Sequence, residues 1–179
     1  PENNFLRPGY LFDGWSNKSS GGTLYTTGQS IDFAPEIDDT ITEKIYYANW
    51  KIIKYTITYN LNGGTNSDDA KTSYYVTDET YTLPTPTREG YSFIGWYKES
   101  DFQSKVTKIA SGSTGNKTLY AKWEAKEVNY VVKHYQQKIN AGDDQNTTNY
   151  TLKETETLTA ATDSMIKPSV KTYTGFTAQ

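Results

Sequence analysis

The side chains that could perform chemistry in this chain are few, and their spacing is unfavourable for catalysis. His134 is the only histidine among 179 residues, and there is no cysteine. A Ser-His-Asp or Cys-His site would have to use this histidine, but the sequence has no nucleophile-elbow motif and no thiol. We therefore expect no catalytic residue, no enzymatic activity and no cofactor.

Pairs of neighbouring acids are the other candidates for chemistry. They are Asp38-Asp39, Asp68-Asp69 and Asp143-Asp144. None has the alternating Asp/Asn-Gly-Glu spacing of a calcium loop, and zinc sites built on cysteine are excluded. A glycosidase-like carboxylate pair would need a cleft-building scaffold, which the sequence does not indicate. We interpret the pairs as solvated turn acids and predict no metal site.

Four tryptophans offer flat apolar faces that could stack on sugars. They are Trp15, Trp50, Trp96 and Trp123. The alternative is that each anchors a small hydrophobic core, because a module of about 70 residues has little other apolar area to bury. We favour the core interpretation for all four.

Tyrosine is unusually frequent, with 16 in the chain. Three small cores cannot bury that many rings, so some should lie exposed on strand faces, where a ring with a polar rim suits sugars and protein partners. The ligand-binding residues are unknown from sequence. Tyr75, Tyr97 and Tyr135 are the candidates we name.

An internal repeat organises these aromatic residues. The heptapeptide GYLFDGW at 9–15 returns as GYSFIGW at 90–96, and YYANW at 46–50 returns as LYAKW at 119–123. Two ordered matches indicate repeated modules, which are usually assembled for reach and adhesion. We expect the remaining heptapeptide aromatics, Tyr10, Phe12, Tyr91 and Phe93, to join the tryptophans in the cores. The glycines between them fit a bulge or a close backbone approach better than a phosphate cradle.

The middle copy predicts short strands. Residues 55–61 alternate Tyr, Ile, Tyr and Leu with polar residues, and Asn62-Gly63-Gly64 then signals a turn. Residues 73–83 are extended by composition, and 91–98 and 117–124 are further strands. The prediction is a mainly β fold, α+β at most.

The repeat also sets the module boundaries. We predict a first module at 1–53, incomplete at its start and with an insertion, a complete module at 54–125, and a divergent module at 126–179 that is incomplete at its end. The linkers, 51–54 and 125–127, are very short, which favours a stiff elongated array. We interpret the chain as an excised piece of a longer protein.

Composition excludes other classes of protein. The net charge is −3 without a basic cluster, so we expect no nucleic-acid partner. No apolar run approaches the roughly 20 residues of a membrane span, so we expect no membrane insertion by this segment.

The middle module resembles the Listeria–Bacteroides repeat, also called the internalin B-repeat. The matching stretches are 55–60 with 62–64, then 87–97, then 119–123, and residues 6–50 match in part. The final module is similar to mucin-binding-protein repeats of Gram-positive surface proteins, through residues 128–135 and 171–177.

The resemblance implies tandem β-grasp-like, ubiquitin-like modules in a secreted, cell-wall-linked protein at the bacterial surface. The implied function is a non-catalytic stalk or spacer, with adhesion to host or matrix as an added role. Two alternatives stay open: a dedicated carbohydrate- or mucin-binding module, and an accessory region of an extracellular enzyme. Partners would be a host glycoprotein, a glycan or a cell-wall polymer.

Overall fold

The computed structural model describes residues 5–26, 29, 45–138 and 149–174. This part of the chain contains strands, turns and loops, and no α-helix, so none of its segments is a helix that could cross a membrane. In chain order the strands are β1 (Tyr10–Ser16), β2 (Leu24–Tyr25), β3 (Tyr47–Ile52), β4 (Tyr55–Asn60), β5 (Ser73–Tyr74), β6 (Tyr81–Thr82), β7 (Tyr91–Tyr97), β8 (Lys105–Val106), β9 (Lys108–Ile109), β10 (Lys117–Ala125), β11 (Glu127–Gln137) and β12 (Tyr150–Ala161). The predicted mainly β class is confirmed.

The middle module is a five-stranded mixed sheet in the order β5-β4-β10-β7-β8. Its first long strand, β4, lies parallel to its last, β10, and the other pairs are antiparallel. A separate two-stranded ladder, β6-β9, lies on the core. The alternating sequence of 55–61 predicted the inward face correctly, because Ile57 is buried and its alternate neighbours pack against the core.

One hydrophobic core belongs to this module. Its buried members are Ile57, Tyr74, Leu83, Trp96, Ile109, Leu119 and Ala121. They come from the sheet, from β9 and, in Leu83, from the residue directly after β6, so the sheet and the β6-β9 ladder close on each other. The stretch 73–83, predicted as continuously extended, contains only the short strands β5 and β6, because a turn lies between them.

The turn predicted after β4 is present, and its residues suit its backbone conformation. Asn62 and Gly63 both have positive φ, at 47° and 85°, which asparagine and glycine tolerate. The Asn62 side chain donates to the carbonyl of Ala121 at 2.8 Å and so attaches this turn to β10.

The first module has a three-stranded antiparallel sheet, β2-β1-β3. Its two long strands repeat the pairing of β7 with β10, including the expected bulge at the second glycine of each heptapeptide. Phe12 pairs with Trp50 as Phe93 pairs with Trp123. No described residue forms a strand beside β3 in the place that β4 takes beside β10.

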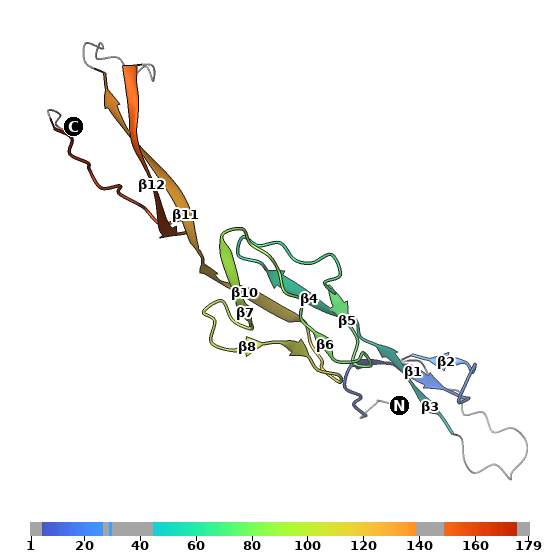
Figure 1. Ribbon diagram of the computed structural model, residues 1–179. Coiled ribbons are helices and arrows are strands. Elements are labelled where there is room, and N and C mark those ends of the chain that lie inside the picture. The colour runs from blue at the N-terminus through green and yellow to red at the C-terminus, as the bar shows by residue number, and fades with distance from the viewer. Residues whose placement is uncertain (1–4, 27–28, 30–44, 139–148, 175–179) are drawn as a thin grey trace, which may run out of the picture.

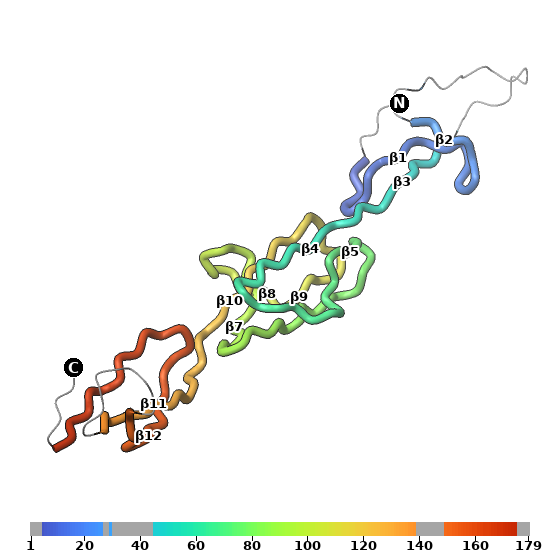
Figure 2. The backbone as a smooth tube through the Cα atoms, turned by 90° about the horizontal axis from the view of Figure 1, so that it is seen from above, coloured from blue at the N-terminus to red at the C-terminus, as the bar shows by residue number. Residues whose placement is uncertain are grey.

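The last module consists of a long antiparallel hairpin, β11-β12, followed by an extended segment to residue 174. Figure 1 shows the three parts in a row, and Figure 2 shows the same row from above. The strand β3 continues into β4 after two residues, and β10 continues into β11 after one.

Burial of the expected core aromatics differs between modules. Trp96 is 2% exposed and lies in the core. Phe93 and Trp123 are half-buried and pack against that core. The expectation that Trp15 is buried like Trp96 is wrong, since Trp15 is half-buried. The residues Tyr10, Phe12, Trp50 and Tyr91 are also half-buried and lie outside the core cluster.

Candidate functional site

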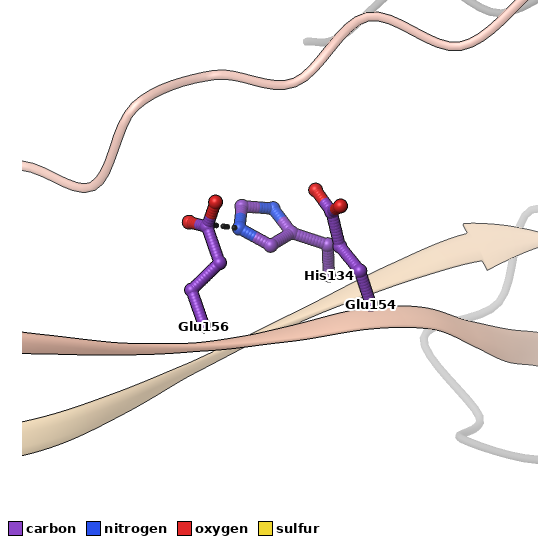
Figure 3. Close-up of side chains that lie close together, drawn as sticks. All are labelled: His134, Glu154 and Glu156. Atoms are coloured by element: carbon purple, nitrogen blue, oxygen red, sulfur yellow. Dashed lines mark hydrogen bonds and ion pairs between the residues drawn. The ribbon is translucent and has the colours of Figure 1, made fainter.

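The densest group of titratable side chains lies on the hairpin of the last module. Its members are His134 on β11, Glu154 and Glu156 on β12, and Lys171 and Tyr173 on the segment that follows. His134 and Glu154 are directly opposite partners in the ladder, while Glu156 is the diagonal neighbour on the same face. Figure 3 shows the imidazole between the two carboxylates.

The side chain of Lys171 supplies the positive charge of this group. Its Nζ lies 3.4 Å from Oε1 of Glu154 and also contacts Oε1 of Glu156. His134 Nε2 lies 3.3 Å from Oε2 of Glu156, and the Tyr173 hydroxyl donates to Glu154 at 3.2 Å. The group therefore holds the segment 171–173 against the hairpin.

The charges in this group shift one another's protonation. The hydrogen bond from Lys171, with a further one from His134, lowers the pKa of Glu156. The same contact with Glu156 raises the pKa of Lys171. Both carboxylates remain partly open to water, with side-chain exposures of 28% for Glu156 and 40% for Glu154, so screening limits the strength of these pairs.

His134, Glu154 and Glu156 offer three metal-ligand atoms within 4.8 Å of one another. One imidazole and two carboxylates are a possible donor set for a divalent ion. The ammonium of Lys171 contacts both carboxylates, so a cation would compete with it. The sequence analysis missed this group because the register of β11 against β12 could not be read. The Glu-x-Glu spacing on one strand face was its only signal.

A shallow hollow of about 550 Å³ lies over the middle module. It is lined by Asn60, Asn62, Arg88, Ser100, Phe102, Tyr120, Ala121, Lys122 and Trp123. Amide, cationic and aromatic side chains together can bind polar ligands with apolar faces. Two of these groups already serve the fold, since Asn62 donates to Ala121 and Arg88 donates to the Asn62 carbonyl at 3.0 Å.

The three tyrosines named as ligand candidates lie in different environments. Tyr135 is exposed at 53%. Tyr75 is half-buried. Tyr97 is only 9% exposed and packs edge-on against Phe102, so the expectation that it is exposed is wrong. The structure does not bring the three together, since they lie on β7, on β11 and in the loop after β5.

The acid pairs gather no site among the described residues. Asp68 and Asp69 are both exposed, as solvated turn acids are. The pairs Asp38-Asp39 and Asp143-Asp144 lie outside the described residues, as do most of the predicted insertion in the first module and the last part, 175–177, of the stretch similar to mucin-binding repeats.

Comparison with known families identifies the repeat. The model of the Listeria-Bacteroides repeat domain matches residues 1–38 and 55–122, which is more than half of the chain. The chain therefore belongs to the Listeria-Bacteroides repeat family. The matched regions do not reach the last module, so its likeness to mucin-binding repeats stays a prediction.

Several curated proteins are similar to the chain. A protein of Evansella cellulosilytica named as a Gly-rich membrane protein is 33% identical over 120 residues, covering 66% of this chain and 12% of that protein. Internalin H of Listeria monocytogenes is 34% identical over 121 residues, covering 65% of this chain and 20% of that protein. The chain thus spans a fifth or less of these relatives. No solved structure matches it.

Proposed function

We propose that this segment is a non-catalytic spacer that holds other parts of a bacterial surface protein away from the cell. The observation that supports the proposal is the arrangement of the modules in a row, with β3 running directly into β4 and β10 directly into β11 (Figure 1). Modules connected in this way contact only their neighbours, so the length of the array grows with the number of modules. The similarity to an internalin and to proteins named for the membrane supports an extracellular or surface location.

The strand order of the middle module supports the β-grasp-like fold. In that fold the first and last strands lie parallel at the centre of the sheet, as β4 and β10 do here. The face that a helix would cover is occupied instead by the β6-β9 ladder, from which Ile109, with the neighbouring Leu83, enters the core. The proposed module is therefore a β-grasp-like sheet with a helix replaced by a short ladder.

The reach of the spacer can be estimated from its strands. Residues 47–60 and 117–137 are almost continuously extended and overlap only where β4 lies beside β10. About 30 residues of extended backbone then run along the row, which is roughly 100 Å at about 3.3 Å per residue.

A height measurement tests the spacer function. The C-terminal end would be attached to a supported membrane, and the height of a fluorophore at position 47, at the outer end of β3, would be measured by fluorescence interference contrast. We expect a height on the order of 100 Å. A height of a few tens of ångströms, which means that the chain lies flat or folds back, would refute the proposal.

Adhesion is the second candidate function, and the hollow over the middle module favours it. Its polar and aromatic lining, chiefly Asn60 and Tyr120, is the surface we expect a glycan to use. A glycan array and a mucin pull-down would compare the chain with Tyr120→Ala, Tyr75→Ala and Tyr135→Ala. Binding lost only in Tyr120→Ala would support the hollow. Absence of binding in both assays would refute adhesion, and the spacer function would then be the one proposed function that remains.

A further inference from the structure

The two junctions between modules are built alike. At the first, the backbone N–H of Ile53 donates to the carbonyl of Gly9 at 2.9 Å. At the second, the N–H of Lys126 donates to the carbonyl of Gly90, also at 2.9 Å. Each donor comes directly after the last residue that pairs with the heptapeptide strand, Ile52 or Ala125. The chain therefore leaves each module along the first glycine of the repeated motif.

These two glycines occupy the same kind of turn. The N–H of Tyr10 donates to the carbonyl of Arg7, and the N–H of Tyr91 donates to that of Arg88, so each turn is Arg-x-Gly-Tyr. Gly9 and Gly90 have φ of 80° and 75°. A four-residue turn with positive φ at its third position favours glycine there.

The next module contacts each glycine from the same structural position. A Cβ on Gly9 would lie 2.4 Å from Cβ of Val76, and one on Gly90 would lie 2.6 Å from Cγ2 of Thr162. The two contacting residues are equivalent in register. Tyr55 and Val128, each two positions after the junction donor, pair with Tyr74 and Ala160. Val76 and Thr162 each come two positions after that partner. Neither glycine could carry a side chain without moving the next module.

The arginine and tyrosine of the turn form the rim of this contact. The Arg7 guanidinium lies 3.9 Å from the centre of the Tyr10 ring, and that of Arg88 lies 3.6 Å from the Tyr91 ring. Such stacking stiffens the turn, because it fixes two long side chains against one another.

We propose that the Arg-x-Gly-Tyr turn is a docking surface for the following module of the same chain. The repeated heptapeptide then has two functions: its Gly-Tyr half seats the next module in a fixed orientation, and its Phe-x-x-Trp half builds the core. This inference goes beyond the spacer function and does not depend on where the protein resides. It explains why Tyr10 and Tyr91, which we expected in the cores, lie outside them.

The second junction has additional contacts. The Tyr91 hydroxyl donates to the Asp163 carboxylate, and the N–H and Oγ1 of Thr162 donate to the Lys126 carbonyl at 2.9 and 3.1 Å. The residue equivalent to Asp163 at the first junction is Thr77, which has no carboxylate. We therefore chose the second junction for the test.

The test measures the spread of distances across the second junction. Because the chain has no cysteine, Thr118→Cys and Thr155→Cys, at exposed positions on β10 and β12, give two clean spin-label sites. In this background we expect one narrow distance distribution by double electron–electron resonance. Gly90→Ala should at least double its width, because the new methyl group displaces Thr162.

The matched control is Gly115→Ala, which introduces alanine at a similar φ, 80° against 75° for Gly90, but meets no atom within 4 Å. Its distribution should stay narrow. Tyr91→Phe removes only the hydroxyl that contacts Asp163, so it should broaden the distribution by less than Gly90→Ala does. If Gly90→Ala unfolds, Tyr91→Phe still tests the proposal. An unchanged width in both Gly90→Ala and Tyr91→Phe, or equal broadening in Gly115→Ala, would overturn the proposal. A broad distribution in the unsubstituted chain would also overturn it, and a low height on the membrane with a narrow distribution would refute only the spacer function.

Discussion

The first and middle modules contain the same aromatic trio in different surroundings. The ring centre of Phe12 lies 5.4 Å from that of Trp15 and 5.6 Å from that of Trp50, and both pairs pack edge to face. In the middle module the corresponding distances from Phe93 are 5.5 Å to Trp96 and 5.3 Å to Trp123, with similar interplanar angles. The spacing and the angles of the rings are thus nearly the same, yet among the described residues only the middle trio lies against a buried core.

The difference shows that two antiparallel strands fix the trio, whereas other elements bury it. Trp96 packs against Tyr59 of β4 at 5.0 Å and donates to the carbonyl of Pro84 at 2.6 Å. Trp15 has Phe5 at 6.4 Å as a further ring contact, and no described strand lies beside β3 where β4 lies beside β10. The aromatic trio is therefore a local packing unit of two strands, and the rest of the module buries it.

Truncating the buried tryptophan gives the largest expected effect. We expect Trp96→Ala to lower the free energy of unfolding of the middle module by about 3–5 kcal/mol, because a large side chain leaves a cavity in a small core. Chemical denaturation followed by amide exchange in β7 and β10 would measure it. An unchanged transition would show that Trp96 is not a core residue.

Substitution of Gly64 tests how closely the turn after β4 packs on the Trp123 ring of the middle trio. A Cβ at this position would lie 2.4 Å from Cζ2 of Trp123, whose Nε1 donates to the Leu61 carbonyl at 2.8 Å. We expect Gly64→Ala to cost about 1–3 kcal/mol by overpacking. The control is the same substitution combined with Trp123→Phe, which removes the struck ring atoms. If alanine costs as much in both backgrounds, the clash with Trp123 is not the cause.

Trp15→Ala sharpens the comparison with a smaller effect. Because Trp15 is half-buried, it should contribute about half of the area term of a buried tryptophan, or roughly 1–2 kcal/mol. Amide exchange in β1 and β3 would report it, with Trp96→Ala measured in parallel. Equal losses for the two substitutions would mean that the modules have equivalent cores.

The smallest effect concerns the charged group on the last hairpin. Since the folded pKa of Glu156 is lowered, its stabilising contribution is complete above the ordinary value of 4.5 and is lost as the pH falls through the lower folded value. Lys171 has a raised pKa, so its contribution persists up to its ordinary 10.5 and is lost above it. Chemical shifts of Lys171 and Tyr173 should follow the acid transition. Glu156→Gln should abolish it, and its persistence in that variant would assign it to another group.

The sequence predicted the long strands and the paired signatures, because alternation and repeated aromatics are local patterns. It predicted the inward face of β4 and the turn at Asn62 for the same reason. It could not predict that Tyr97 is covered by Phe102, or that Tyr91 lies at a junction, because these depend on contacts between segments. The group around His134 was missed for the same cause, since it depends on strand register.

Small-angle X-ray scattering of the chain tests the central claim most directly. A row of modules about 100 Å long has a radius of gyration of about 30 Å. We predict a value near this, with a pair-distance distribution that has a long tail. A value of roughly 16 Å, expected for one compact globule of 179 residues, would contradict the account.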